Sequence, residues 1–138
     1  MRFPPPPAVW LTGACVLAAS CTTAPSAPSA SQLAGTWNVV TIRAAGGGDQ
    51  ARPAGAQYYM TLETGRLSLR ADCNTCTGPA TQWSTTISIG PMACTRALCA
   101  TAAFETALTT ILSGDHTAAI SGNTLTLVSS RGVIRFER

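Results

Sequence analysis

Apolar and polar residues alternate most clearly in residues 66–73, which predicts a β-strand with one buried face. The apolar positions of this segment are Leu67, Leu69, Ala71 and Cys73. Other segments rich in β-branched or aromatic residues, and bounded by turn residues, predict further strands. These strands are expected at residues 35–42, 58–63, 80–84, 86–89, 118–121, 124–129 and 133–138.

A single segment has the period of a helix, because its apolar residues recur at intervals of three and four. They are Phe104, Ala107, Leu108, Ile111 and Leu112. Thr101 is the expected N-cap of this helix and Gly114 its expected end. Several strands, one helix and three more strands follow one another without βαβ alternation. We therefore predict an α+β fold, a compact twisted antiparallel β-sheet curled around a single α-helix.

The first twenty residues have the layout of an export signal. Arg2 precedes an apolar run over residues 8–19, which is shorter than the roughly twenty residues of a membrane-spanning helix. Residues 17–21 resemble the lipobox of bacterial lipoproteins. This resemblance implies cleavage after residue 20 and attachment of diacylglycerol to Cys21. The alternative is an ordinary signal peptide followed by an incidental cysteine.

Residues 21–32 are uncharged and rich in serine, proline and alanine. Such a segment cannot bury enough surface to fold, so we expect a flexible tether between the lipidated Cys21 and a domain of residues 33–138. In Gram-negative lipoproteins a residue other than aspartate after the lipidated cysteine permits sorting to the outer membrane, and Thr22 fits that rule. The expected location is therefore the cell envelope, at the outer membrane and facing the periplasm.

The charge of the chain excludes some classes of partner. All nine basic residues are arginines, against six acidic residues, and removal of Arg2 with the signal leaves a net charge near +2. A small, scattered charge makes no footprint for nucleic acid. The expected partners are the membrane, through the lipid anchor, and an unknown envelope protein or wall component. The protein is expected to be a monomer.

Four of the six cysteines remain once the signal is removed and Cys21 is lipidated. They are Cys73, Cys76, Cys94 and Cys99. An even number in an exported domain predicts two disulfides, whereas a zinc ribbon or a redox motif at residues 73–76 is the alternative. We predict the pairs Cys73–Cys94 and Cys76–Cys99, and no metal ion or cofactor. The local pairs, or Cys73–Cys99 with Cys76–Cys94, are the other pairings.

Several segments resemble the META domain, also called the HslJ-like family. They are residues 33–37, 65–69, 72–74, 87–95, 104–108, 120–127 and 132–136. The resemblance implies a compact antiparallel sheet packed on a helix, and it brings no established reaction or catalytic residue. Members of the family are linked to heat shock, antibiotic tolerance and virulence. Two features depart from the family pattern. Asp72 replaces a glycine, and Cys76 and Cys99 are two additional cysteines.

Candidate catalytic groups are few. His116 follows Asp115 and is expected to be a solvated loop residue, and the six acidic residues are scattered. No nucleophile elbow, P-loop or dinucleotide fingerprint is present. We therefore predict a non-enzymatic envelope lipoprotein that acts in binding or in the stress response. A small enzyme or thiol-redox protein that uses the four cysteines is the alternative.

Two other residues are singled out by their type and position. Asn74, beside Cys73, is the candidate for a special polar residue, and satisfying a turn and nearby backbone groups is favoured over ligand contact. Trp83 lies in a polar strand, so the pattern leaves open whether it is buried or exposed for binding.

Overall fold

The computed structural model describes Pro4 and residues 27–138. Apart from Pro4, the predicted signal peptide (residues 1–20), the lipidation at Cys21 and residues 22–26 of the tether lie outside these residues. No helix in the described part of the chain is long and apolar enough to cross a membrane.

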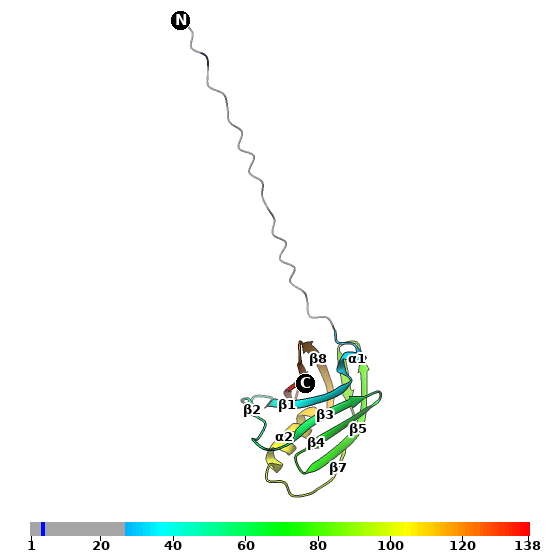
Figure 1. Cartoon of the computed structure of the whole chain (residues 1–138), viewed down its shortest axis with the longest axis vertical. Helices are drawn as coiled ribbons and strands as arrows, with labels where there is room; N and C mark the ends of the chain where they lie inside the picture. Colours follow the sequence, from blue (N-terminus) through cyan, green and yellow to red (C-terminus); the bar gives the residue numbers. More distant parts are fainter. Residues whose placement is uncertain (1–3, 5–26) are drawn as a thin grey trace.

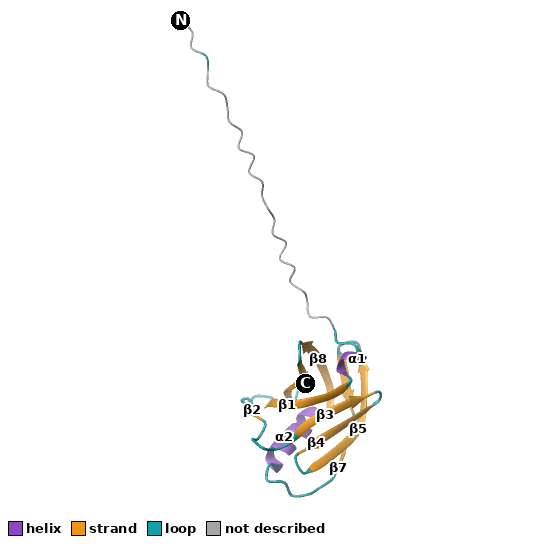
Figure 2. Cartoon of the chain, in the orientation of Figure 1, coloured by secondary structure: helices purple, strands orange, loops and turns teal. Residues whose placement is uncertain are grey.

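Two helices and ten strands make up the described domain (Figure 2). The helices are α1 (Ala30–Leu33) and α2 (Ala102–Leu112). The strands are β1 (Gly35–Ala44), β2 (Gln50–Ala51), β3 (Tyr58–Glu63), β4 (Arg66–Ala71), β5 (Asn74–Trp83), β6 (Thr86–Ile89), β7 (Ala93–Cys94), β8 (Gly114–Ser121), β9 (Thr124–Ser129) and β10 (Gly132–Glu137). Residues 30–32, which the sequence assigns to the tether, thus form α1 together with Leu33.

The strands close into an eight-stranded antiparallel β-barrel, so the predicted α+β sheet curled around a helix is wrong. Hydrogen bonding runs in the order β1, β3, β4, β5, β6, β8, β9 and β10, and β10 returns to β1. Strands hold 53% and helices 13% of the residues that the structure describes. Alternation along each strand shows which face is buried, but it does not show that the first and last strands pair.

One bulge in β1 allows that closure. The beginning of β1 pairs with β3, from Gly35 opposite Leu62 to Asn38 opposite Tyr59. The rest pairs with β10, and the register shifts between Val39 and Thr41. Because a bulge bends its strand and increases the local twist, β1 can serve two neighbours and close the barrel.

A single core fills the barrel and includes the apolar stripe of α2. The buried helix residues are Phe104, Leu108, Ile111 and Leu112, which confirms the predicted helix. Trp37 is fully buried, and the Arg138 guanidinium lies over its ring at 3.7 Å. Among the described residues, only Asn74 and His116 are buried polar side chains.

His116 is not the solvated loop residue that its neighbours predict. β8 begins at Gly114, four residues before the predicted strand, and it places the His116 side chain inside, only 1% exposed. Its Nδ1 faces the Gly114 carbonyl oxygen at 3.0 Å, and its Nε2 faces the Ile111 carbonyl oxygen at 2.9 Å. The ring therefore lies between two backbone carbonyl groups, one in the last turn of α2 and one at the start of β8.

The two ends of the barrel carry different features and are called the tether end and the braced end. At the tether end, the chain enters through α1 beside the tip of the β5–β6 hairpin (Figure 1). At the braced end lie the β4–β5 turn, β7 and the segment that leads into α2 (Figure 1).

Candidate functional site: a loop braced by two disulfides

The segment from Thr95 to Ala100 connects β7 to α2 at the braced end and is called the braced loop. Two disulfides hold it, Cys76–Cys94 at its start and Cys73–Cys99 near its end. Their Cα atoms lie 4.0 Å and 5.7 Å apart, respectively. Two disulfides are present, but the predicted pairs Cys73–Cys94 and Cys76–Cys99 are wrong.

The direction of β7 explains the observed pairing. β7 runs antiparallel to β5, and Cys94 lies directly opposite Cys76 in the register. In an antiparallel pair, residues before one partner face residues after the other. Cys73 therefore meets Cys99, whereas the predicted pairs would need the two segments to run parallel.

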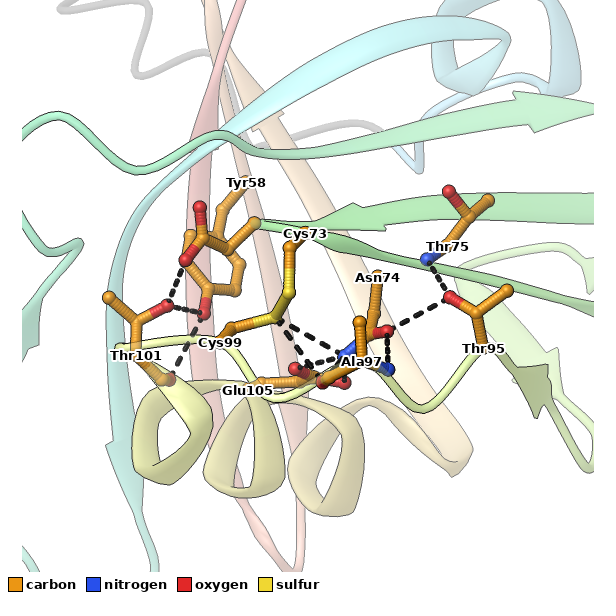
Figure 3. The surroundings of a disulfide bond; sticks show 10 residues. Tyr58, Cys73, Asn74, Thr75, Thr95, Ala97, Cys99, Thr101 and Glu105 are labelled. Atoms are coloured by element: carbon orange, nitrogen blue, oxygen red, sulfur yellow. Dashed lines mark hydrogen bonds between the residues drawn. A yellow bond between two sulfur atoms is a disulfide. The ribbon is translucent and has the colours of Figure 1, made fainter.

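Asn74 fixes the middle of the braced loop (Figure 3). Its Nδ2 donates to the Ala97 carbonyl oxygen at 2.9 Å, and its Oδ1 accepts from the Ala97 N–H at 2.8 Å. One side chain thus satisfies both backbone groups of a loop residue, as a neighbouring strand would. The loop is held at three points: Cys94, Ala97 and Cys99.

Further hydrogen bonds of Asn74 join the loop to α2 and hold its first residue, Thr95, against β5. Nδ2 also lies 3.0 Å and 3.1 Å from the two carboxylate oxygens of Glu105, in the first turn of α2. Oδ1 accepts a second bond from the Thr95 hydroxyl, and Thr95 is itself paired with the Thr75 backbone. Asn74 is 2% exposed, so these bonds are protected from water.

A second polar chain holds the N-terminus of α2 (Figure 3). The Thr101 hydroxyl donates to the Asp72 carboxylate at 2.7 Å and lies 2.7 Å from the Tyr58 hydroxyl. Asp72 has a φ of 55°, the left-handed conformation that asparagine, aspartate and glycine best tolerate. The pKa of Tyr58 is raised, chiefly by burial and further by the nearby Asp72 and Glu105 charges, although the Thr101 hydrogen bond opposes the shift.

The two largest exposed side chains of the braced loop are those of Arg96 and Leu98. Leu98 is 100% exposed, and Arg96 is also exposed. Within residues 27–138 Arg96 has no salt-bridge partner, since the one bridge found there joins Arg43 to Asp49. The loop backbone is therefore restrained, while its apolar and cationic side chains are free to contact another molecule.

The sulfur-bearing and acidic side chains of this end are engaged in contacts within the protein. The sulfurs of all four cysteines are consumed in disulfides, which does not favour the redox alternative. In the described part of the chain, no group of three or more His, Cys, Asp or Glu side chains could hold a metal ion. Asp72 and Glu105 are engaged by Thr101 and Asn74, and His116 contacts backbone carbonyls instead.

Comparison with known proteins identifies the family. A family model described as the META domain matches residues 31–138. The chain belongs to the META domain family. The match covers the whole barrel, both helices and the braced loop, and the resemblance seen in the sequence is thereby confirmed.

Two solved structures share the fold of this META domain. An NMR structure of a protein from Burkholderia xenovorans is 22% identical, with a TM-score of 0.67, and the match covers 100% of this chain and 97% of that one. A second NMR structure is 14% identical, with a TM-score of 0.62, and the match covers 80% and 94%. At these identities the likeness shows the fold alone. No curated protein matches the chain.

Sequence reasoning found part of this site. It singled out Asn74 and the four cysteines, and the structure brings all five together. It missed Leu98 and the bonds among Tyr58, Thr101 and Asp72, which come from three segments distant in the chain. One signal was available: Arg96 and Leu98 lie in a short stretch between two cysteines, where a loop tied at both ends must expose its central residues.

Proposed function

We propose that this META-domain protein is a non-enzymatic lipoprotein, anchored at the cell envelope through Cys21, that binds a protein partner with the braced loop. The observation that carries the proposal is the complete exposure of Leu98 on a loop held at three points.

A restrained loop with an exposed apolar side chain has the properties of a binding element. A single exposed leucine is ordinary on a protein surface. Here, however, the loop is already ordered, so a partner would lose little conformational entropy in binding it. Burial of the Leu98 side chain in a partner's pocket would contribute roughly 1.5–3 kcal/mol. Arg96, two residues away, adds a planar cation that suits a carboxylate at the rim of that pocket.

Site-specific photocrosslinking in cells tests the binding element. A photoreactive amino acid at position 98 is expected to give a discrete adduct with an envelope protein. The same amino acid at Val128, an exposed apolar residue of β9, is the matched control and should give none. Purified wild-type domain should compete the adduct away, and the Leu98→Asp domain should not. Equal crosslinking at both positions would reject the braced loop as the binding element.

The lipid anchor has its own test. Replacement of Cys21 by serine should move the protein from the membrane fraction to the soluble fraction, or leave its signal uncleaved. The mature mass should lose its acyl chains. Unchanged fractionation and mass in this variant would reject the anchor and leave the binding loop unaffected.

We further propose that binding serves tolerance of heat or antibiotic stress, as the family resemblance implies. A strain that lacks the protein should grow less well at high temperature or with novobiocin, and the wild-type gene should restore growth. The Leu98→Asp gene should fail to do so, whereas the Val128→Asp gene should succeed. Full rescue by the Leu98→Asp gene would show that stress tolerance does not depend on the braced loop.

A further inference from the structure

We propose that the tether end of the barrel rests on the lipid surface of the membrane that anchors the protein, with the Trp83 side chain in the interfacial layer. The proposal rests on the lipid anchor of the proposed function. It adds an orientation: the tether end faces lipid, and the braced loop points away from it.

Trp83 is the most exposed aromatic residue in the described part of the chain, at 72% of its surface. It ends β5 and pairs with Thr86 across a two-residue turn. The first turn residue, Ser84, has a φ of 53°. A tryptophan held outward on a tight hairpin carries a large apolar ring and one polar N–H, a combination suited to the boundary between water and lipid.

The path of the chain brings this tryptophan close to the lipidated cysteine. The Gln82 side-chain amide donates to the Pro28 carbonyl oxygen at 2.7 Å, and Pro28 is buried. The tether is thus fixed to the residue next to Trp83. Seven residue steps separate Pro28 from Cys21, and they span about 25 Å when fully extended.

This reach is short compared with the domain. A domain of about a hundred residues has a radius of gyration near 13 Å, so its diameter exceeds even the fully extended reach of these seven residues. A lipid at Cys21 therefore keeps the tether end nearer to the membrane than the braced end.

An apolar hollow next to Trp83 enlarges the surface that lipid could cover. It lies between α1 and the β3–β4 turn, with a volume of about 560 Å³. Leu33, Leu62, Ala80 and Ile87 contribute to its lining. At the rim, Glu63 and Arg66 are register partners of opposite charge, so this turn carries no net charge that would oppose approach to a lipid headgroup layer.

Tryptophan fluorescence tests this orientation on vesicles to which the protein is anchored by chemical coupling. The chain from Cys21 onward is coupled through the Cys21 thiol to a maleimide lipid in vesicles of phosphatidylethanolamine and phosphatidylglycerol, 3:1. Because the coupling does not depend on lipidation in cells, a negative result here is distinct from failure of the anchor. Trp37 is fully buried and provides a constant background, which the Trp83→Phe variant measures.

On these vesicles, iodide quenching of Trp83 is expected to fall at least threefold relative to the uncoupled protein. Lipids brominated near the headgroup should quench Trp83 at least twofold. The matched control is Trp83→Phe with Leu98→Trp, which moves the exposed indole to the braced loop. It should remain fully accessible to iodide and unquenched by brominated lipid. Equal iodide quenching of Trp83 with and without coupling, or equal lipid quenching at positions 83 and 98, would overturn the proposal.

Discussion

The two ends of this barrel are held by different forces. At the braced end, two disulfides and the bonds of Asn74 and Thr101 fix an exposed loop. At the tether end, the four-residue α1 carries a capping box at Ser29 and buries Leu33. Gln82 adds one side-chain bond to the incoming chain. Covalent and buried polar restraints gather at the braced end, whereas local hydrogen bonds and the burial of Leu33 hold the chain where it enters.

Removal of a disulfide tests this contrast with the largest expected effect. Loop-closure entropy predicts that Cys76→Ser with Cys94→Ser, or Cys73→Ser with Cys99→Ser, lowers the free energy of unfolding by about 3 kcal/mol. The closed segments are similar in length, with sequence separations of 18 and 26. Urea denaturation of both double variants measures the loss. An unchanged midpoint in either variant would show that its disulfide does not brace the domain.

A matched pair of amide deletions compares the ends directly. Asn74→Ala leaves the Ala97 N–H and carbonyl without their partner, so we expect a loss of about 2–3 kcal/mol. Gln82→Ala removes the bonds to the Pro28 and Ser84 carbonyl oxygens at the tether end and should lower the free energy of unfolding by no more than about 1 kcal/mol. Urea denaturation of the two variants gives the comparison. Equal losses would mean that the braced end has no special dependence on polar restraint.

The raised pKa of Tyr58, at the braced end, predicts that the free energy of unfolding depends on pH. A tyrosine whose pKa is higher in the folded state binds more protons there than when unfolded. Its contribution is therefore complete below the ordinary value of 10.0 and is lost as the pH rises through the folded pKa. Denaturation between pH 8 and pH 11 should show stability falling at the alkaline end, and less steeply in Tyr58→Phe. Identical pH profiles for the two proteins would contradict this.

The exposed residues of both ends should matter least for stability. Leu98→Ala and Trp83→Ser each remove a solvated side chain. The free energy of unfolding, measured by thermal denaturation, should therefore change by less than about 0.5 kcal/mol. A larger loss in either variant would show that the side chain packs within the protein, and it would remove the basis for a role in binding.

Local features of the fold could be read from the sequence, because they depend on neighbouring residues. Alternation in residues 66–73 predicted β4, and the spacing of Phe104 to Leu112 predicted α2. The distant relations could not be read in this way. Closure needs β10 to meet β1, the disulfides depend on β7 running antiparallel to β5, and His116 is buried because β8 starts early.

The same holds for the candidate site. Asn74 stood out by its residue type and its place beside Cys73, and the structure gives it backbone partners in the loop. Leu98 looked like any other apolar residue, because exposure is a property of the folded surface. Trp83 was undecided for the same reason, and only the position of its hairpin shows that it faces solvent.

The pairing of β1 with β10 also bears on when the domain can fold. Closure joins residues as distant as Asn38 and Glu137, so a nascent chain cannot complete the barrel until β10 is available. Until then β1 has an open edge, and contacts of such sequence separation form slowly. Late closure suits a polypeptide that, on our proposal, must thread through a translocation pore before it folds. Pairing of Glu137 with Asn38 then completes the barrel.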